Sequence, residues 1–419
     1  MAINAIRGFN DILPGEVEKW QIFEDTARGL LESFGFSEIR IPLLEKTELF
    51  VRGIGDTTDI VEKEMFTFPD RHGEMITLRP EGTAPVVRAF IEHSIYARDP
   101  VSRLYYMGPM FRYERPQKGR YRQFYQIGAE VFGIENPFAD AEILSMLMEL
   151  FKRTKIKGAE LQINSLGCKE CRPHYKTRLL EFLKAKTGEL CLDCQRRLNS
   201  NPLRVLDCKN EGCRRATTDA PSILDNLCQR CSEHFSGVKS NLDNLGTGYS
   251  INPRMVRGLD YYQKTAFEIV SSSLGSQNTI AAGGRYDGLV KDLGGPEIPG
   301  IGFAIGMERA VSLIGVPDAG FVRRPALFIA TMGERAREWA SKTKYDLNVN
   351  GIWVEIDYEG KSMKSQMRRA DKIGAMFTVV VGDTEIDSGM AILKDMDGHK
   401  EEEMLLSAVA EKLISSRKK

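Results

Sequence analysis

The chain has 419 residues, of which 42% are hydrophobic and 28% charged, and its formal net charge is zero. This length predicts two or three domains, and the composition excludes a disordered or membrane-embedded chain, since no apolar run approaches the roughly 20 residues of a spanning helix. We therefore expect a folded cytoplasmic protein without a signal peptide or membrane contact, in which any RNA binding comes from local basic patches.

Periodic patterns predict the first elements of the chain. Apolar residues recur at helical spacing between Val17 and Leu31, and the pattern stops at Gly35, which predicts an amphipathic helix. Residues 37–42 then alternate as a strand that ends in a proline. Residues 65–68 and 75–78 flank a polar turn and predict a hairpin. An antiparallel sheet is indicated, rather than the parallel sheet of a Rossmann fold.

A strongly basic loop follows between two predicted strands, at residues 104–111 and 124–132. The loop carries Arg112, Arg115, Lys118, Arg120 and Arg122. Guanidinium groups match the geometry of phosphate, so this loop predicts an anion site, although a solvated charged loop is the alternative. Gln126 and Glu130 follow at even spacing and leave the same face of the second strand.

The eight cysteines of the chain fall in one segment between residues 168 and 238. They are Cys168, Cys171, Cys191, Cys194, Cys208, Cys213, Cys228 and Cys231. Three Cys-x-x-Cys units predict structural zinc in a cytoplasmic protein, where disulfides are disfavoured, and buried free thiols are the alternative. Proximity suggests one site from the middle four cysteines and a second from the first and last pairs. The segment is expected to be a mostly helical insertion, because strand patterns at 160–164 and 265–270 flank it.

The last hundred residues alternate between strand and helix patterns. Strands are predicted at 326–330, 351–356 and 377–381, and helices at 334–343, 362–372 and 401–414. This order predicts a small α/β domain. Lys364, Arg368 and Lys372 share one face of the second helix, which is either a contact for an RNA backbone or a solvated face.

The basic hairpin resembles motif 2 of the class II aminoacyl-tRNA synthetases in its histidyl-tRNA synthetase form. Five further segments agree with this family in the same order: residues 7–11 (RGFND), 78–83 (LRPEGT), 257–262 (RGLDYY), 281–288 (AAGGRYDG) and 302–309 (GFAIGMER). The helix and strand that end at Pro42 resemble motif 1, which builds the dimer interface in this class. The complete set of eight cysteines departs from much of the family.

The resemblance implies an α+β fold in three parts. Residues 1–167 and 239–322 would form the catalytic domain, with an antiparallel sheet flanked by helices. Residues 168–238 would form the cysteine-rich insertion, and residues 323–419 an α/β anticodon-binding domain.

The resemblance also implies a reaction. A homodimer would use ATP and Mg²⁺ to activate L-histidine as histidyl-adenylate, and would transfer it to the 3′ end of tRNA(His) with release of AMP and pyrophosphate. The alternative is a synthetase-like regulatory subunit that binds histidine without charging tRNA. That alternative is disfavoured because the expected catalytic arginines and a C-terminal domain are all present.

The resemblance assigns roles to individual residues. Arg112 would bind the α-phosphate and the histidine carboxylate, Arg309 the terminal phosphate, and Arg257 the charge that develops at phosphorus. The residues expected to hold histidine are Glu81, Thr83, Arg112, Gln126, Glu130, Arg257, Tyr261, Tyr262 and Tyr286. Those expected at ATP are Arg112, Glu114, Arg120 and Arg309, and those expected at the tRNA acceptor stem are Arg115, Gln117 and Lys118. Glu81 could instead cap the helix that follows it.

Overall fold

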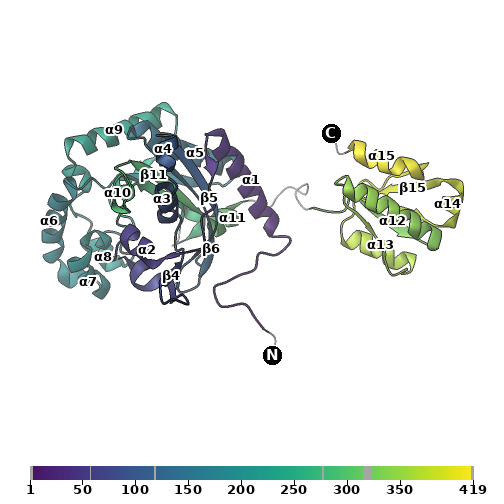
Figure 1. The fold of residues 1–419 in the computed structure, drawn as a ribbon, viewed down its shortest axis with the longest axis horizontal. Helices are drawn as coiled ribbons and strands as arrows, with labels where there is room; N and C mark the ends of the chain where they lie inside the picture. Colours follow the sequence, from purple (N-terminus) through teal and green to yellow (C-terminus); the bar gives the residue numbers. More distant parts are fainter. Residues whose placement is uncertain (1–2, 57, 118, 276–277, 315–322, 417–419) are drawn as a thin grey trace. The chain divides into compact units, whose positions relative to one another are not determined.

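A computed structural model describes residues 3–56, 58–117, 119–275, 278–314 and 323–416. The chain divides into two compact units, Met1–Val316 and Pro317–Lys419. Within the described part of the chain, no helix is both long enough and apolar enough to cross a membrane. The first unit is built on a large sheet with helices on both faces (Figure 1).

The large sheet has eight strands and is mainly antiparallel. In spatial order they are β1 (Ser37–Glu38), β5 (Ser102–Phe111), β6 (Gln123–Phe132), β11 (Gly300–Gly306), β10 (Thr279–Arg285), β9 (Gln263–Ser271), β7 (Ala159–Ser165) and β8 (Ser250–Ile251). Every pair from β5 to β7 is antiparallel, and only the outermost strands β1 and β8 pair in parallel. The predicted antiparallel fold is confirmed.

The strand predicted at residues 37–42 is much shorter in the structure. Only Ser37 and Glu38 pair with β5, and the main chain then leaves the sheet. The carbonyls of Ile41 and Pro42 accept hydrogen bonds from the Arg79 guanidinium, at 2.7 and 3.3 Å. A buried arginine thus satisfies backbone carbonyls that a neighbouring strand would otherwise bind.

Helices cover both faces of the sheet. One face carries α1 (Val17–Ser33), α5 (Pro137–Arg153), α9 (Gln229–Asn244) and α11 (Met307–Leu313), whose apolar residues share one core with the strands. The other face carries α3 (Thr83–Glu92) and α10 (Leu289–Asp292). Neighbouring residues of β5 divide between the two cores, Tyr105 in the first and Tyr106 in the second, as the two-residue period of a strand requires.

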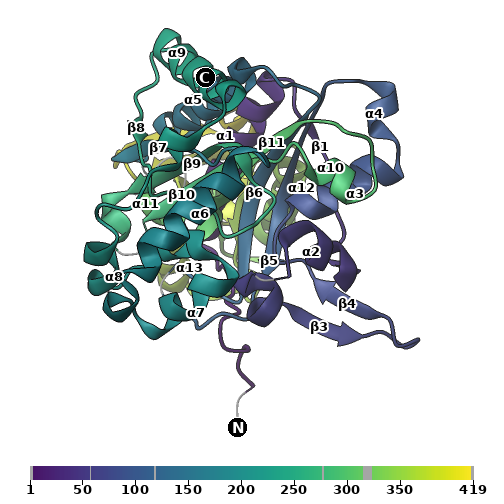
Figure 2. The same ribbon diagram turned by 90° about the vertical axis from the view of Figure 1, so that its left-hand side faces the viewer.

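Smaller elements complete the first unit. The predicted hairpin forms β3 (Phe66–Pro69) and β4 (Met75–Leu78), and β2 (Leu44–Lys46) pairs with β4 to make a three-stranded sheet. The short helices α2 (Thr47–Ile54), η1 (Ile60–Glu64) and α4 (Ile95–Arg98) lie before β5 in the sequence. Figure 2 shows the β3–β4 hairpin extending away from the large sheet.

The cysteine-rich segment is helical, as predicted. Its elements are α6 (Cys171–Lys184), η2 (Thr187–Glu189), α7 (Leu192–Ser200), η3 (Pro202–Val205), α8 (Glu211–Ala216) and η4 (Ile223–Asn226). They enclose a core of their own, and α6, α7 and α8 group together in Figure 2. The following helix α9 runs through residue 238 and packs its apolar face into the core of the large sheet.

The second unit is the separate α/β domain that the sequence predicts. Its sheet order is β13 (Val354–Ile356), β12 (Leu327–Thr331), β14 (Phe377–Val381), β15 (Met390–Asp395) and β16 (Glu401–Leu405), and its helices are α12 (Glu334–Val349), α13 (Met363–Lys372), α14 (Asp383–Ser388) and α15 (Leu406–Ser416). The helix predicted at 401–414 is wrong in its first five residues, which pair as β16 with β15. On α13, Lys364, Arg368 and Lys372 are exposed, while the opposite face packs on the sheet.

Candidate active site

A cavity of about 290 Å³ opens on the α3 face of the large sheet. Side chains from β6, β10 and β11, the β5–β6 loop, the start of α3 and residues 257–262 converge on it. The predicted ligand-binding residues that line it are Glu81, Thr83, Arg112, Glu114, Arg120, Gln126, Arg257, Tyr261, Tyr262 and Arg309. The cavity therefore brings together residues more than 200 positions apart in the sequence.

The loop between β5 and β6 divides into an inner and an outer part. Arg120 forms ion pairs with Glu114 and, at 3.6 Å, with Glu64. Arg115 and Gln117, expected at the acceptor stem, are exposed and lie outside the cavity lining. Lys118, the third such residue, lies outside the described residues.

Three arginines reach the cavity from different elements. Arg112, at the end of β5, donates from Nε to the Pro80 carbonyl at 2.9 Å. Arg309, in the first turn of α11, donates to the carbonyls of Gly119 and Thr279 at 3.0 and 2.8 Å. Burial lowers the pKa of Arg309, and the neighbouring cations Arg120 and Arg112 lower it further. An anionic ligand would relieve this repulsion between guanidinium groups.

The third arginine, Arg257, is held by an acidic and an aromatic partner. Its Nη1 donates to Glu268 at 2.8 Å, and its guanidinium lies 5.1 Å from the centre of the Tyr262 ring. Within the described residues, Arg257 Nε and Gln126 Oε1 are buried polar atoms without a hydrogen-bond partner. Because such atoms are normally satisfied in a folded protein, they indicate where a ligand binds.

Glu81 caps the helix that follows it, which is the alternative role that the sequence suggested. Its carboxylate accepts hydrogen bonds from the backbone amides of Thr83 and Ala84, at 2.6 and 2.9 Å. Burial raises the pKa of Glu81, and these two hydrogen bonds oppose that shift. The side chain also lines the cavity, so capping fixes its position there.

Glu130 and Tyr286 lie beneath the cavity and do not line it. Glu130 is fully buried and accepts hydrogen bonds from the Thr83 hydroxyl, at 2.8 Å, and from the Tyr286 hydroxyl. Burial raises the pKa of Glu130 to about 8. In this arrangement Thr83 lies between the Glu130 carboxyl and the open part of the cavity.

The raised pKa of Glu130 predicts a pH-dependent stability. The folded state holds a proton up to about pH 8, whereas the unfolded chain releases it near the ordinary value of 4.5. The contribution of Glu130 to the free energy of unfolding is therefore expected to be constant below about pH 4.5, and to fall as the pH rises to about 8. Chemical denaturation between pH 5 and 9 measures this fall. A Glu130→Gln variant should lose part of it, and an unchanged slope would contradict the assignment.

Two glycines make room for this buried group. Gly302 on β11 lies opposite Glu130 on β6, and a Cβ atom at Gly302 would overlap the Glu130 carboxyl. A Cβ atom at Gly128 would overlap the Tyr106 ring in the same way. The glycine-rich sequence of this part of the sheet is therefore explained by the space that the buried side chains need.

Substituting Gly302 by alanine is expected to displace the Glu130 carboxyl. Overpacking of this kind costs roughly 1–3 kcal/mol of the free energy of unfolding. Thermal denaturation measures the effect. Gly29→Ala is a suitable control because Gly29 is exposed on α1 with nothing near its Cβ position. Equal behaviour of the two variants would contradict this account of Gly302.

No ligand role was predicted for several residues that also line the cavity: Tyr106, Tyr121, Phe124, Thr279 and Glu308. Glu308 accepts a hydrogen bond from the Tyr125 amide at 2.9 Å, and burial raises its pKa to about 7. Acidic residues are common in the first turn of a helix, where they interact with the helix dipole. The position of Glu308 in the sequence therefore does not indicate that it lines a cavity.

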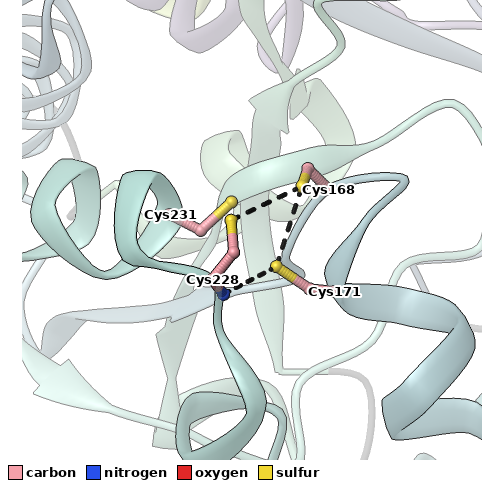
Figure 3. A group of neighbouring side chains, drawn as sticks. All are labelled: Cys168, Cys171, Cys228 and Cys231. Atoms are coloured by element: carbon pink, nitrogen blue, oxygen red, sulfur yellow. Dashed lines mark hydrogen bonds between the residues drawn. The ribbon is translucent and has the colours of Figure 1, made fainter.

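The cysteines form two clusters away from this cavity. Cys168, Cys171, Cys228 and Cys231 form one, shown in Figure 3, and Cys191, Cys194, Cys208 and Cys213 form the other. Within each cluster all sulfur atoms lie within 4.8 Å of one another. These are the two sets that sequence proximity and the ends of the insertion suggested, and all eight cysteines are free thiols.

Individual distances in the clusters are much longer than a disulfide bond. The Sγ of Cys168 lies 3.7 Å from that of Cys171 and 3.8 Å from that of Cys228, and the Sγ atoms of Cys191 and Cys208 are 3.9 Å apart. Backbone amides also donate to sulfur, from Cys228 to Cys171 at 3.0 Å (Figure 3) and from Cys191 to Cys213 at 3.1 Å.

An antiparallel sheet with arginines from the motif 2 hairpin and from α11 around one cavity is the arrangement of a class II aminoacyl-tRNA synthetase. Comparisons with known proteins agree. A family model described as histidyl-tRNA synthetase matches residues 8–310, and one described as anticodon binding domain matches residues 326–416. The chain therefore belongs to the histidyl-tRNA synthetase family, whose members are ligases.

Curated relatives resemble the chain over nearly its full length. A histidine–tRNA ligase from Geobacter sulfurreducens is 60% identical over 94% of this chain and 95% of its own, and one from Syntrophotalea carbinolica is 55% identical over 99% of each. The crystal structure of apo Staphylococcus aureus histidyl-tRNA synthetase has a TM-score of 0.83 at 38% identity, covering 98% of this chain and all of its own.

Proposed function

We propose that this chain activates L-histidine with ATP in the cavity on the α3 face, and transfers it to tRNA(His) as a histidine–tRNA ligase. The observation that carries the proposal is the set of four arginines around one cavity, beside a buried carboxyl and several tyrosines. Attack of a carboxylate on the α-phosphorus of ATP joins two anions, so cations and positioning must supply most of the catalysis.

We assign the chemistry to the arginines as follows. Arg112 binds the histidine carboxylate and the α-phosphate, and Arg257 stabilises the charge that develops at phosphorus. Arg309 and Arg120 bind the remaining phosphates. No general base is needed, because the attacking carboxylate is already ionised. Magnesium would add positive charge at the phosphates, and Glu114 and Glu308 supply carboxylate oxygens of the kind that Mg²⁺ prefers.

Histidine specificity would come from the deeper part of the cavity. Gln126 and Glu81, which line the cavity, would hold the α-amino group, and Tyr261 and Tyr262 would contact the ring. Glu130, hydrogen-bonded to Tyr286 and to the Thr83 hydroxyl, would support this pocket from behind Thr83. Arg115, Gln117 and Lys118 on the β5–β6 loop are proposed acceptor-stem contacts.

We propose the same three-part organisation that the sequence suggests, with the catalytic domain at 1–167 and 239–322, the insertion at 168–238 and the anticodon-binding domain at 323–419. Lys364, Arg368 and Lys372 of α13 are proposed contacts for the tRNA backbone. The chain is proposed to act as a cytoplasmic homodimer. Exposed apolar residues on and near the three-stranded sheet, among them Leu44, Phe68 and Met75, support an interface. A monomer in sedimentation velocity would contradict it.

The regulatory-subunit alternative is not favoured. A solved chain from Bacillus halodurans whose title names an ATP phosphoribosyltransferase regulatory subunit/histidyl-tRNA synthetase is 19% identical to this one, with a TM-score of 0.66, and shows a shared fold only. Histidine-dependent exchange of pyrophosphate into ATP distinguishes the two functions, because a regulatory subunit would not catalyse it.

We propose that each cysteine cluster holds one structural Zn²⁺. Four thiolates at about 2.3 Å from a tetrahedral zinc lie about 3.8 Å from one another, which agrees with the sulfur separations of 3.7–3.9 Å. Amides that donate to sulfur would stabilise the thiolate form. These clusters are far better suited to a metal than to disulfides, whose sulfur atoms are about 2.05 Å apart.

Purified protein is expected to contain about two zinc ions per chain by elemental analysis. Because metal ligation contributes to the stability of a small helical module, chelation should lower the temperature of unfolding. A Cys208→Ser variant should retain about one zinc, since only the second cluster loses a ligand. Less than about half a zinc per chain, with unchanged unfolding after chelation, would contradict the assignment.

A further inference from the structure

The first cysteine cluster joins two helices that belong to different cores. Cys171 begins α6, whose Tyr175 and Leu179 pack in the core of the insertion. Cys228 precedes α9 and Cys231 lies in its first turn, while farther along α9 Phe235 packs in the core of the large sheet. Bonds to a shared metal would therefore fix the insertion to the catalytic sheet.

Arg172, the residue after Cys171, connects this cluster to the active site. Its guanidinium donates to the carbonyl of Leu166 at 3.1 Å and to the carbonyl of Tyr262. Tyr262 lines the cavity, and its ring lies beneath the guanidinium of Arg257. Arg172 alone thus connects a cluster cysteine, its neighbour in the sequence, to a backbone atom of a proposed histidine-contacting residue.

The segment from Met255 to Tyr262 depends on such outside contacts, because it forms neither helix nor strand. At its start, the Asn164 amide donates to the Met255 carbonyl at 3.0 Å, and the neighbouring Arg254 donates to the Thr217 carbonyl of the insertion at 3.2 Å. Near its end, Asn201 of the insertion donates to Asp260 at 3.3 Å. The insertion therefore holds both ends of the segment that carries Arg257.

We propose that the metal at the first cluster positions the Arg257–Tyr262 segment through Arg172, so that histidine affinity depends on this metal site. The inference rests on the proposed ligase function and on zinc in the cluster. Arg172 is a positioning residue: it touches the backbone of Tyr262, and the guanidinium fork can hold two carbonyls only while α6 stays in place. Arg112 and Arg309, to which we assign the ATP phosphates, lie on other elements, so ATP binding should be affected less.

The test uses the full-length chain and three variants. Arg172→Gln removes the guanidinium fork, and Cys228→Ser removes one ligand of the first cluster. Arg178→Gln is the matched control, because Arg178 lies on the exposed side of the same helix and donates to Asn226 within the insertion. The measurements are zinc content, thermal unfolding, and KM for histidine and for ATP in pyrophosphate exchange.

Arg172→Gln is expected to keep two zinc ions and to raise KM for histidine roughly tenfold, with KM for ATP changed by less than about twofold. Cys228→Ser should lose one zinc and show the same histidine defect, while Arg178→Gln behaves as the parent chain. An unchanged KM for histidine in Arg172→Gln, or equal increases for both substrates, would overturn the proposal even if Cys228→Ser fails to fold. A parent chain without exchange would instead contradict the proposed function.

Discussion

Replacing Arg112 by glutamine is expected to reduce kcat for histidine-dependent pyrophosphate exchange by roughly a hundred- to a thousandfold, the range typical for loss of a donor that stabilises developing charge. Glutamine keeps a hydrogen-bond donor but removes the positive charge between the attacking carboxylate and the α-phosphate. Arg112 is placed by its hydrogen bond to Pro80 and by the Phe124 ring, 5.2 Å from its guanidinium. The rate of exchange under saturating histidine and ATP measures the effect.

The same variant should remain folded. Burial lowers the pKa of Arg112, which means that the folded protein holds this charge at a cost. The free energy of unfolding should therefore be unchanged or higher in Arg112→Gln. Arg98→Gln, at an exposed site on α4, is the control for loss of an arginine. Activity of Arg112→Gln within about tenfold of the parent chain would refute the assigned role.

Replacing Asp140 by alanine is expected to lower the free energy of unfolding by about 3 kcal/mol, because it removes the carboxylate that pairs most closely with a buried arginine and leaves Asp287 as the remaining acidic partner. Arg285 on β10 is fully buried and donates to Asp140 on α5, from Nε at 3.0 Å and from Nη2 at 2.6 Å. This pair fixes the strand that leads directly into Tyr286. Urea denaturation measures the loss.

Two controls define this effect. Glu149→Ala removes an exposed ion pair with Arg153 on the same helix, and should cost less than about 1 kcal/mol. The double variant Asp140→Leu with Arg285→Met removes both charges, and should recover much of the stability lost in the single variant. A single variant that loses less than about 1 kcal/mol would show that Arg285 is not dependent on Asp140.

Residue patterns within short segments correctly predicted the β5–β6 hairpin and the helix α1. The β5–β6 hairpin was predictable from aromatic and branched residues on both sides of a loop, and the structure pairs Met107 with Ile127 and Gly108 with Gln126 as a continuous ladder. The helix α1 was predictable from the spacing of Trp20 and Phe23, which are buried on one face. In both cases the sequence pattern that predicts the element lies within the element itself or on the two sides of one loop.

Long-range contacts explain the errors. Residues Glu401–Leu405 have the composition of a helix, but the chain returns on itself after Asp395 and pairs them with β15. Short-range patterns also leave out the Arg79 guanidinium, which binds the Ile41 carbonyl beyond the end of β1 from 38 positions away. The burial of Glu308 likewise depends on packing against β6, more than 180 positions earlier.

The candidate site shows the same division. The motifs contain the four arginines and most of the residues that line the cavity. Their side chains meet because β6, β11 and β10 are neighbours in the sheet. The motifs did not reveal that Glu130 lies behind Thr83, whereas capping of α3 by Glu81 was suggested as an alternative role and is confirmed. The pairing of the first and last cysteine pairs was predictable because the two ends of the insertion should lie close together. The structure agrees, since the flanking strands β7 and β9 are neighbours in the sheet.

The central claim is tested most directly by histidine-dependent exchange of labelled pyrophosphate into ATP, followed by charging of tRNA(His) with the same preparation. The account predicts exchange that requires Mg²⁺ and L-histidine, that other amino acids do not replace, and that is followed by histidine transfer to tRNA(His). Folded protein that shows no exchange with histidine, or that exchanges equally well with another amino acid, would contradict it.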